Sequence, residues 1–230
     1  PDFFEFHLSY KDMDLKLKEV IHQKYDVDFV VHSPDTFTGD HLLDLSNPDP
    51  SHRKRSIAEL QRVVHVTNEL KSYFKGNDKT LIIASLGGFT TDRMLTVDQR
   101  DERYRILADS FHQIDTTGVE IIAQTLPPYP WYFGGQLFLN LFVTPEDTAL
   151  FCRENDLRIC FDVSHSKMTC NQLHLSFKSF VDLIAPLSAH LHIADAKGVD
   201  GEGLQIGHGD MDFVVTAQND VNLAWFENDG

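Results

Sequence analysis

Two stretches of this sequence end in side chains of the kinds that bind metals. The first reads RICFDVSH and carries Asp162 and His165, and the second reads AHLHIAD and carries His192 and Asp195. Both begin as short apolar runs, which are typical of buried parallel strands, and the C-terminal ends of such strands form the active face of a parallel α/β protein. Because carboxylates and imidazoles are ordinary ligands of divalent metals, we expect a metal or sugar site where these ends meet.

Further polar side chains fall at the ends of earlier apolar runs. In chain order they are His7, His32, Ser85 and Gln124. A single histidine at a strand end is more often a hydrogen-bonded structural residue than a ligand, so no one of these positions decides the function. Asp162 carries more weight, because an ionised carboxylate near a buried strand end needs a partner, although His165 alone would meet that need.

Two loops add candidate residues. The loop PPYPWYFGG follows the Gln124 run and contains Trp131, whose ring can stack on a sugar or simply pack in a rigid loop. A glycine-rich loop after His192 contains Glu202 and His208, which either reach the site or stay in solvent. The sequence leaves both choices open.

The apolar patterns predict strands and helices in alternation. The predicted strands are Phe3–Ser9, Phe29–Ser33, Leu81–Ser85, Glu120–Thr125, Ile159–Val163 and His190–Ala194, with a further one near Val221–Phe226. Helical spacing recurs over 57–70 and 104–114, and Asp49-Pro50 and Thr144-Pro145 are typical helix starts. Repeated βα units of this kind form either a doubly wound sheet or a barrel, and the strand number fits a barrel that lacks one unit.

Composition excludes several classes of protein. The chain has 230 residues with no linker-like stretch, which suits one domain over 1–230, and its formal charge of −15 disfavours nucleic acid. It contains no apolar run of the ~20 residues that a membrane span needs, and we expect no signal peptide. The three cysteines have no zinc-type spacing and are typical of reduced thiols in a cytoplasmic protein. Since the chain opens at Pro1 without a methionine, we expect it to be part of a longer protein.

Several of these motifs together resemble one family. The segments VHSP, LLDLSNPD and LIIASLGG, which begin at Val31, Leu42 and Leu81, are similar to successive parts of the xylose isomerase-like TIM barrels. The segments FDVSH and HLHIAD, around Asp162 and His192, resemble that family's Asp-x-x-His and His-x-His strands and are the most specific. FEFHLSYKD and PPYPWYFGGQ are more particularly similar to the barrel domain carried by some N-acetylneuraminate synthase-related bacterial proteins.

The resemblance implies an incomplete TIM-type (β/α) barrel, without the first βα unit, that binds a divalent metal (Mn, Zn, Co or Mg). Family members hold this metal with Glu, Asp, His and Glu. Asp162 and His192 match the second and third ligands, and Gln124 stands where the first Glu is expected. The last Glu has no clean counterpart, since Glu227 lies three or four residues from its place. His165 matches a position that contacts substrate.

The implied function is that of a metal-dependent sugar or sugar phosphate isomerase or epimerase in sialic-acid-type metabolism. The predicted metal ligands are Asp162, His192 and Gln124; the predicted catalytic residues are His165 and Glu202; the predicted substrate contacts are His7, His32, Gln124, Trp131 and His165. We expect a small-molecule sugar as partner, a cytoplasmic location, and no nucleic acid or membrane partner. Homo-oligomerisation stays open.

Two alternatives remain at this stage. Because Gln124 cannot act as a base and the last Glu is missing, the domain can also be a non-catalytic sugar-binding or scaffolding descendant of such enzymes. An apurinic endonuclease relative is the third option. The acidic charge disfavours it, and so does Ser85, which stands where those endonucleases carry a metal-binding histidine.

Overall fold

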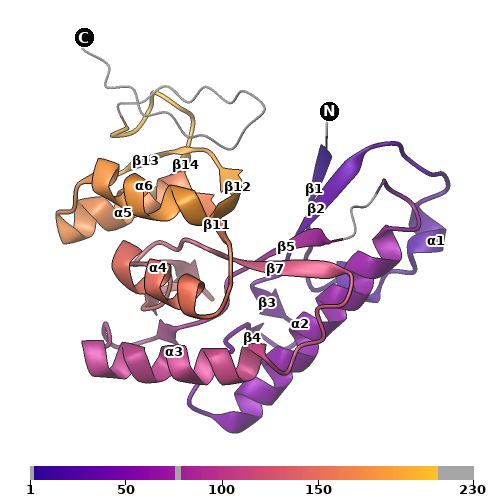
Figure 1. Ribbon diagram of the computed structural model, residues 1–230, viewed down its shortest axis with the longest axis horizontal. Helices are drawn as coiled ribbons and strands as arrows, with labels where there is room; N and C mark the ends of the chain where they lie inside the picture. The colour runs from indigo at the N-terminus through magenta and orange to yellow at the C-terminus, as the bar shows by residue number, and fades with distance from the viewer. Residues whose placement is uncertain (1–2, 76–78, 212–230) are drawn as a thin grey trace. The chain divides into compact units, whose positions relative to one another are not determined.

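The computed structural model describes residues 3–75 and 79–211 (Figure 1). The chain divides into two compact units. The first unit comprises Pro1–Gly88 and Asp101–Ile122, and the second comprises Phe89–Arg100 and Ala123–Gly230. Among the described residues, no helix combines the length and the apolar content needed to cross a membrane.

The first unit is built on parallel strands. They are β1 (Phe3–His7), β2 (Asp28–His32), β5 (Thr80–Ala84) and the first part of β7 (Val119–Gln124). Strand β1 pairs with β2, so that His7 lies beside His32. Strand β2 also pairs with β5, so that His32 lies beside Ile83. The histidines that the sequence placed at strand ends therefore lie together at one end of neighbouring strands.

Helix α2 (Pro50–Leu70) is the long helix of this unit and packs against β5 (Figure 1). Its start follows the prediction, because the Asp49 side chain accepts a hydrogen bond from the backbone N–H of Ser51 and Pro50 occupies the first turn. The remaining elements of the unit are η1 (Asp12–Asp14), α1 (Leu17–Val20), β3 (Thr36–Phe37), β4 (His41–Leu42) and most of α3 (Val97–Phe111).

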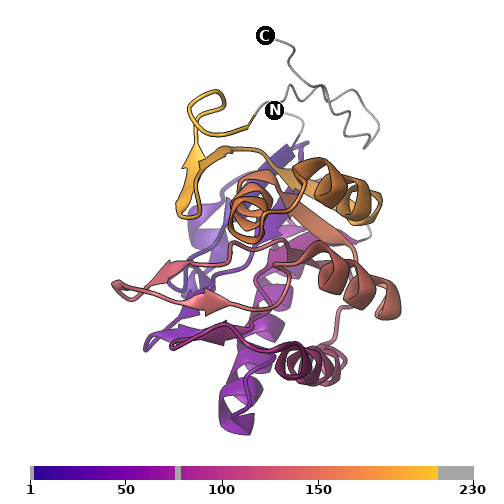
Figure 2. The same ribbon diagram turned by 90° about the vertical axis from the view of Figure 1, so that its left-hand side faces the viewer.

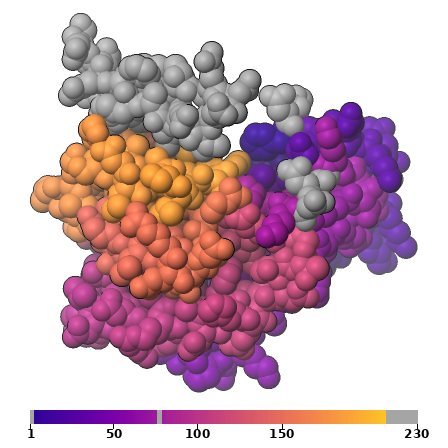
Figure 3. Space-filling model, viewed as in Figure 1, coloured from indigo at the N-terminus to yellow at the C-terminus, as the bar shows by residue number. Residues whose placement is uncertain are grey.

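The second unit contains the end of β7, β11 (Ile159–Asp162) and β12 (Ser188–His192), all parallel. Its helices are α4 (Pro145–Glu154), α5 (Val163–Leu173) and α6 (Phe177–Ile184). Helix α6 packs beside α4, and the two adjoin on the surface in Figure 3. The Phe180 ring of α6 stacks on Phe161 of β11 at 6.1 Å between centroids, which anchors the helix to the buried strand.

The other elements of the second unit are short. They are β6 (Phe89–Thr90), β8 (Trp131–Tyr132), β9 (Gly135–Gln136), β10 (Phe138–Leu139), η2 (Ala185–Leu187), β13 (Asp195–Lys197) and β14 (Gly201–Leu204). Strands β6 and β10, β8 and β9, and β13 and β14 form antiparallel pairs. The β13–β14 hairpin packs on α5.

The parallel strands follow the order β1-β2-β5-β7-β11-β12, which is also their order along the chain. Sequential parallel strands joined through helices are the arrangement of a TIM-type barrel, which has eight such strands. The described residues supply six, so the predicted incomplete TIM-type (β/α) barrel is confirmed. The strand expected near Val221–Phe226 and the residue Glu227 lie outside the described residues.

Most predicted strand limits differ from the observed ones by one or two residues. The largest shift is in β12, which spans Ser188–His192 where the sequence predicted His190–Ala194. The apolar residues Ile193 and Ala194 suggested a longer strand, but the chain leaves the sheet after His192 and Ile193 is 40% exposed. His192 is therefore the terminal residue of its strand.

The three cysteines of the described chain are buried and form no disulfide. Burial raises the pKa of the Cys152 and Cys170 thiols to about 12. Cys160 is also fully buried, in β11.

Candidate active site

Asp162 ends β11 and also caps the helix that follows. Its Oδ1 accepts hydrogen bonds from the backbone N–H of His165 and from the Ser164 hydroxyl, both at 3.0 Å. Helix α5 therefore begins directly at the strand end, without a loop, because Asp162 supplies the N-cap acceptor. This leaves Oδ2 to face the neighbouring strands.

The second oxygen of Asp162 meets side chains from both flanking strands. Gln124 Nε2 lies 3.0 Å from Asp162 Oδ2 and 3.1 Å from His192 Nδ1. The strand register produces this meeting, since Gln124 pairs with Cys160 and Asp162 pairs with His192. An amide nitrogen can only donate, so Nδ1 of His192 accepts and its ring proton lies on Nε2.

His165 joins the same cluster from the first turn of α5. Its Nδ1 donates to the backbone carbonyl of Thr125 at 2.9 Å and lies 3.4 Å from Asp162 Oδ2. Its Nε2 lies 3.4 Å from Glu202 Oε2, on the β13–β14 hairpin. The structure thus brings Glu202, whose place in its glycine-rich loop the sequence left open, next to His165.

The neighbouring groups shift the pKa values of Asp162 and His165 in opposite directions. Burial opposes ionisation of Asp162, but interactions led by those with His165 outweigh it and lower the pKa of Asp162 to about 2. Burial likewise opposes a charge on His165, yet the carboxylates of Asp162 and Glu202 raise its pKa above the ordinary value. A carboxylate therefore lies beside each ring nitrogen of His165, Asp162 by Nδ1 and Glu202 by Nε2.

Two buried hydroxyl residues that the sequence did not single out support the cluster. The Thr125 hydroxyl accepts from the backbone N–H of Asp162 at 2.8 Å, and Ser166 donates to the Asp162 carbonyl at 2.7 Å. Both side chains are fully buried, so these bonds fix the strand end that carries Asp162. The only signal in the sequence was their position, one directly after Gln124 and the other in the first turn of α5.

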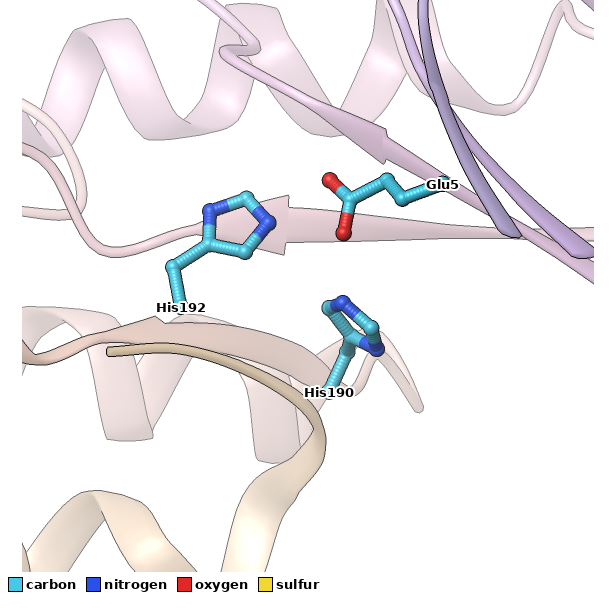
Figure 4. A group of neighbouring side chains, drawn as sticks. All are labelled: Glu5, His190 and His192. Carbon is cyan, nitrogen blue, oxygen red and sulfur yellow. The ribbon is translucent and has the colours of Figure 1, made fainter. Parts of the chain in front are cut away.

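Two further contacts between histidine rings lie at strand ends. His190 and His192 lie on the same side of β12, as the two-residue period of a strand predicts, and their rings meet edge-on at 5.4 Å (Figure 4). In the first unit, His7 and His32 stack with centroids 4.9 Å apart. His32 Nδ1 donates to the Ser33 carbonyl at 2.9 Å.

The aromatic loop after Gln124 forms the β8–β9 hairpin, the salmon hairpin that extends to the left in Figure 2. Tyr132 packs edge-on against Phe89, whereas Trp131 is 64% exposed and Phe133 is 59% exposed. Phe133 also has a φ of 54°, an uncommon conformation for a bulky residue. The hairpin thus packs its Tyr132 ring against Phe89 and exposes the Trp131 and Phe133 rings to solvent.

Asp195 does not take part in this cluster through its carboxylate. The two oxygens accept from four backbone N–H groups, those of Ala196, Gly207, Gly209 and Met211. Burial opposes ionisation, but these bonds lower the pKa of Asp195. The carboxylate that the sequence placed beside His192 therefore organises the loop that carries Glu202.

The spacing of the donor atoms fits a small divalent cation. Asp162 Oδ2 and His192 Nδ1 are 3.6 Å apart, and the Gln124 amide nitrogen lies 3.0 and 3.1 Å from them. Ligands about 2.1 Å from a metal are about 3.0 Å apart when adjacent in an octahedron and about 3.4 Å apart in a tetrahedron. The spacing fits, while the amide turns its nitrogen rather than its oxygen toward the other two donors.

Solved structures with the same fold include several sugar epimerases. A D-tagatose 3-epimerase-like protein superposes with a TM-score of 0.63 at 21% identity, over 92% of this chain and 74% of that protein. An L-ribulose 3-epimerase has a TM-score of 0.56 and 16% identity, and the match covers 92% of this chain and 64% of that protein. A 3-keto-D-glucoside 4-epimerase from E. coli has a TM-score of 0.55 and 16% identity, and the match covers 92% of this chain and 84% of that protein. At these identities the likeness is one of fold.

Comparison with curated protein sequences finds no significant match. The sequence model of one family matches almost the whole chain, from residue 2 to residue 218, across both units. The strand order and the resemblance of the FDVSH and HLHIAD strands agree with this match. The chain therefore belongs to the xylose isomerase-like TIM barrel family.

Proposed function

We propose that this chain is a sugar isomerase or epimerase-like domain that moves a proton beside a carbonyl group with the help of a divalent metal. The observation that carries the proposal is the meeting of Gln124, Asp162, His165, His192 and Glu202 within one unit. Because the family match runs through both units, we take them as parts of one domain.

Proton transfer beside a carbonyl needs one group that removes a proton and one that returns it. Glu202 is the proposed base, since its carboxylate is 56% exposed and can meet a substrate. His165 is the proposed acid, because its Nδ1 is held by the Thr125 carbonyl while its Nε2 points toward Glu202. Gln124 cannot exchange a proton at neutral pH and so contributes only by binding.

The metal would be held by Asp162 Oδ2 and His192 Nδ1, with the Gln124 side chain as a third and weaker ligand. When bound, such an ion polarises the carbonyl of the substrate. The spacing of these atoms supports the assignment, as does the buried Asp162 carboxylate, which stays ionised because its pKa is about 2.

The proposed substrate is a sugar of the acetamido, sialic-acid type. This finer assignment is supported by the resemblance of the FEFHLSYKD and PPYPWYFGGQ segments to domains of N-acetylneuraminate synthase-related proteins. The exposed Trp131 ring suits the apolar face of a sugar. Contacts of His7 and His32 with substrate stay a prediction from the sequence; within the first unit the two residues lie at adjoining strand ends.

Deuterium uptake tests the proposal without knowledge of the product. The purified protein is incubated in D₂O with Mn²⁺, Co²⁺ or Mg²⁺ and a panel of ketoses and acetamido sugars. Proton NMR then detects exchange at the carbon beside the carbonyl. We expect exchange that Glu202→Gln reduces at least about a hundredfold, as is usual for loss of a catalytic base.

Glu154→Gln is the matched control, because Glu154 is an exposed acidic residue of α4. It should leave the exchange rate unchanged. If no sugar of the panel exchanges with any of the metals, or if Glu202→Gln exchanges as fast as the unaltered protein, the proposed catalytic function is wrong.

A non-catalytic sugar-binding domain is the second candidate. The observation that favours it is the neutral Gln124 at the centre of the donor atoms, where an ionised residue would bind a metal more tightly. This candidate predicts that a sugar binds, as measured by calorimetry, while deuterium uptake stays at the rate of the uncatalysed reaction.

A further inference from the structure

The Gln124 amide occupies the position between Asp162 Oδ2 and His192 Nδ1. Its nitrogen lies within hydrogen-bond distance of both, at 3.0 and 3.1 Å. An NH₂ group has two hydrogens, so it can serve both acceptors at once. The lone pairs of Asp162 Oδ2 and His192 Nδ1, which would bind a cation, thus already accept hydrogen bonds from the neutral Gln124 amide.

This arrangement is specific to one orientation of the amide. A metal accepts lone pairs only, so Gln124 can become a ligand only through its oxygen, after the amide turns by about half a revolution. That rotation removes the hydrogen bonds to Asp162 and His192 before the ion replaces them. Both acceptors are largely buried, and a buried acceptor without a partner is costly.

We infer that the Gln124 amide is a neutral substitute for the cation, which keeps the site formed without a metal and makes metal binding weak and dependent on rotation of the amide. The inference rests on the metal site of the proposed function. It explains how the three side chains keep one geometry, since the amide links Asp162 to His192 across β11 and β12.

A glutamate at this position would act in the opposite way. Its carboxylate cannot donate to Asp162, so the two like charges would repel until a cation lies between them. Gln124→Glu keeps the size and shape of the side chain and changes only its charge and its donors. We therefore expect this variant to bind Mn²⁺ about tenfold to a hundredfold more tightly than the unaltered protein.

Titration with Mn²⁺ alone, followed by calorimetry, tests the inference on the full chain. Gln136→Glu is the matched control, because it adds the same charge at an exposed position of β9. It should leave the Mn²⁺ affinity within about twofold, as expected for a screened surface charge. Adding Asp162→Ala to Gln124→Glu should abolish the gain in affinity.

Three results would overturn the inference: equal Mn²⁺ affinity of the Gln124→Glu variant and the unaltered protein, an equal gain in Gln136→Glu, or a gain that survives loss of Asp162. None of these results bears on deuterium uptake by the unaltered protein, which tests the proposed function separately. Conversely, a tight Mn²⁺ site in Gln124→Glu without any sugar exchange would contradict the proposed catalysis and leave this inference standing.

The unaltered protein provides a second test, which does not depend on the variant folding. The side-chain NH₂ of Gln124 should give proton signals that exchange slowly with water in metal-free protein, since both hydrogens are bound. Saturating Zn²⁺, which does not broaden NMR signals, should shift these signals and speed their exchange. If Zn²⁺ binds with the signals unchanged, the amide does not turn and the inference is wrong.

Discussion

The two oxygens of Asp162 make different contacts, and this division can be tested by substitution. Oδ1 caps α5 through the backbone N–H of His165, and Oδ2 faces Gln124 and His192. A single residue thus has one structural and one proposed functional role. Asparagine and alanine remove these roles to different extents, because asparagine can still accept the capping hydrogen bond.

We predict that Asp162→Ala lowers the free energy of unfolding by about 1–3 kcal/mol, since it removes the cap and leaves buried donors without an acceptor. Asp162→Asn should keep most of the stability and still lose Mn²⁺ binding. Urea unfolding and Mn²⁺ calorimetry on both variants measure this. Equal stability of the two variants would show that Oδ1 does not matter as a cap.

His41, in the first unit, makes stability depend on pH. Its Nε2 lies 3.0 Å from the hydroxyl of Ser56, which accepts a backbone hydrogen bond from Asp44, so this hydroxyl donates to a neutral imidazole. Burial, with help from His52 and Arg55, lowers the pKa of His41 to about 4. Protonation of His41 is therefore less favourable in the folded protein than in the unfolded chain, where an ordinary histidine titrates near pH 6.5.

The resulting prediction is a loss of stability as the pH falls. Above about pH 7 both states carry a neutral His41; between about pH 6.5 and pH 4 only the unfolded state binds the proton, and the free energy of unfolding falls by up to about 3 kcal/mol. Urea unfolding from pH 7.5 to pH 4 measures this loss. His41→Gln, which has no titrating group, should show a clearly flatter dependence, and identical curves would refute the assignment.

At the scale of elements, the loop from β13 onward is built around the Asp195 carboxylate. Four backbone N–H groups of the loop donate to it. Gly209 lies so close that a Cβ there would overlap the Ala196 carbonyl and the carboxylate itself. This loop carries Glu202 to His165, so Asp195 acts on the proposed base only through the shape of the loop.

We predict that Asp195→Asn loosens this loop, because an amide cannot accept four hydrogen bonds as a carboxylate does. Proteolysis within the loop should become faster and any sugar exchange slower, while Mn²⁺ affinity stays unchanged because Asp162 and His192 lie before the loop. Asp200→Asn, at an exposed position of the same loop, is the control and should behave as the unaltered protein. A fall in Mn²⁺ affinity in Asp195→Asn would show that the loop also affects the metal ligands and would contradict the prediction.

At the scale of the whole molecule, charge separates the sugar-binding candidates from a nucleic-acid enzyme. The chain has 35 acidic and 20 basic residues, for a formal charge of −15. Phosphate contacts in nucleic-acid complexes come mainly from Lys and Arg, and an acidic protein repels the phosphate backbone.

We therefore predict no measurable binding to duplex DNA at 0.15 M salt, with or without an abasic site. Gel-shift and nicking assays with added Zn²⁺ or Mn²⁺ measure this directly. Specific cleavage of the abasic duplex would restore the endonuclease alternative and contradict the sugar-related proposal.

The sequence determined the repeated strand–helix order, because apolar periodicity, the Asp49-Pro50 cap and the Thr144-Pro145 start depend only on local residues. It also identified Asp162 and His192 as polar groups at strand ends, with His165 three residues after Asp162. These features are local, and a pattern along the chain suffices to find them.

Only the tertiary structure decided which of these residues meet. Strand register placed Gln124 between Asp162 and His192, and the folding of the hairpin brought Glu202 to His165 while the Asp195 carboxylate was taken up by backbone N–H groups. The buried support from Thr125 and Ser166 depends on the same register. Contacts between residues distant in sequence are set by strand pairing and loop closure, which no local pattern encodes.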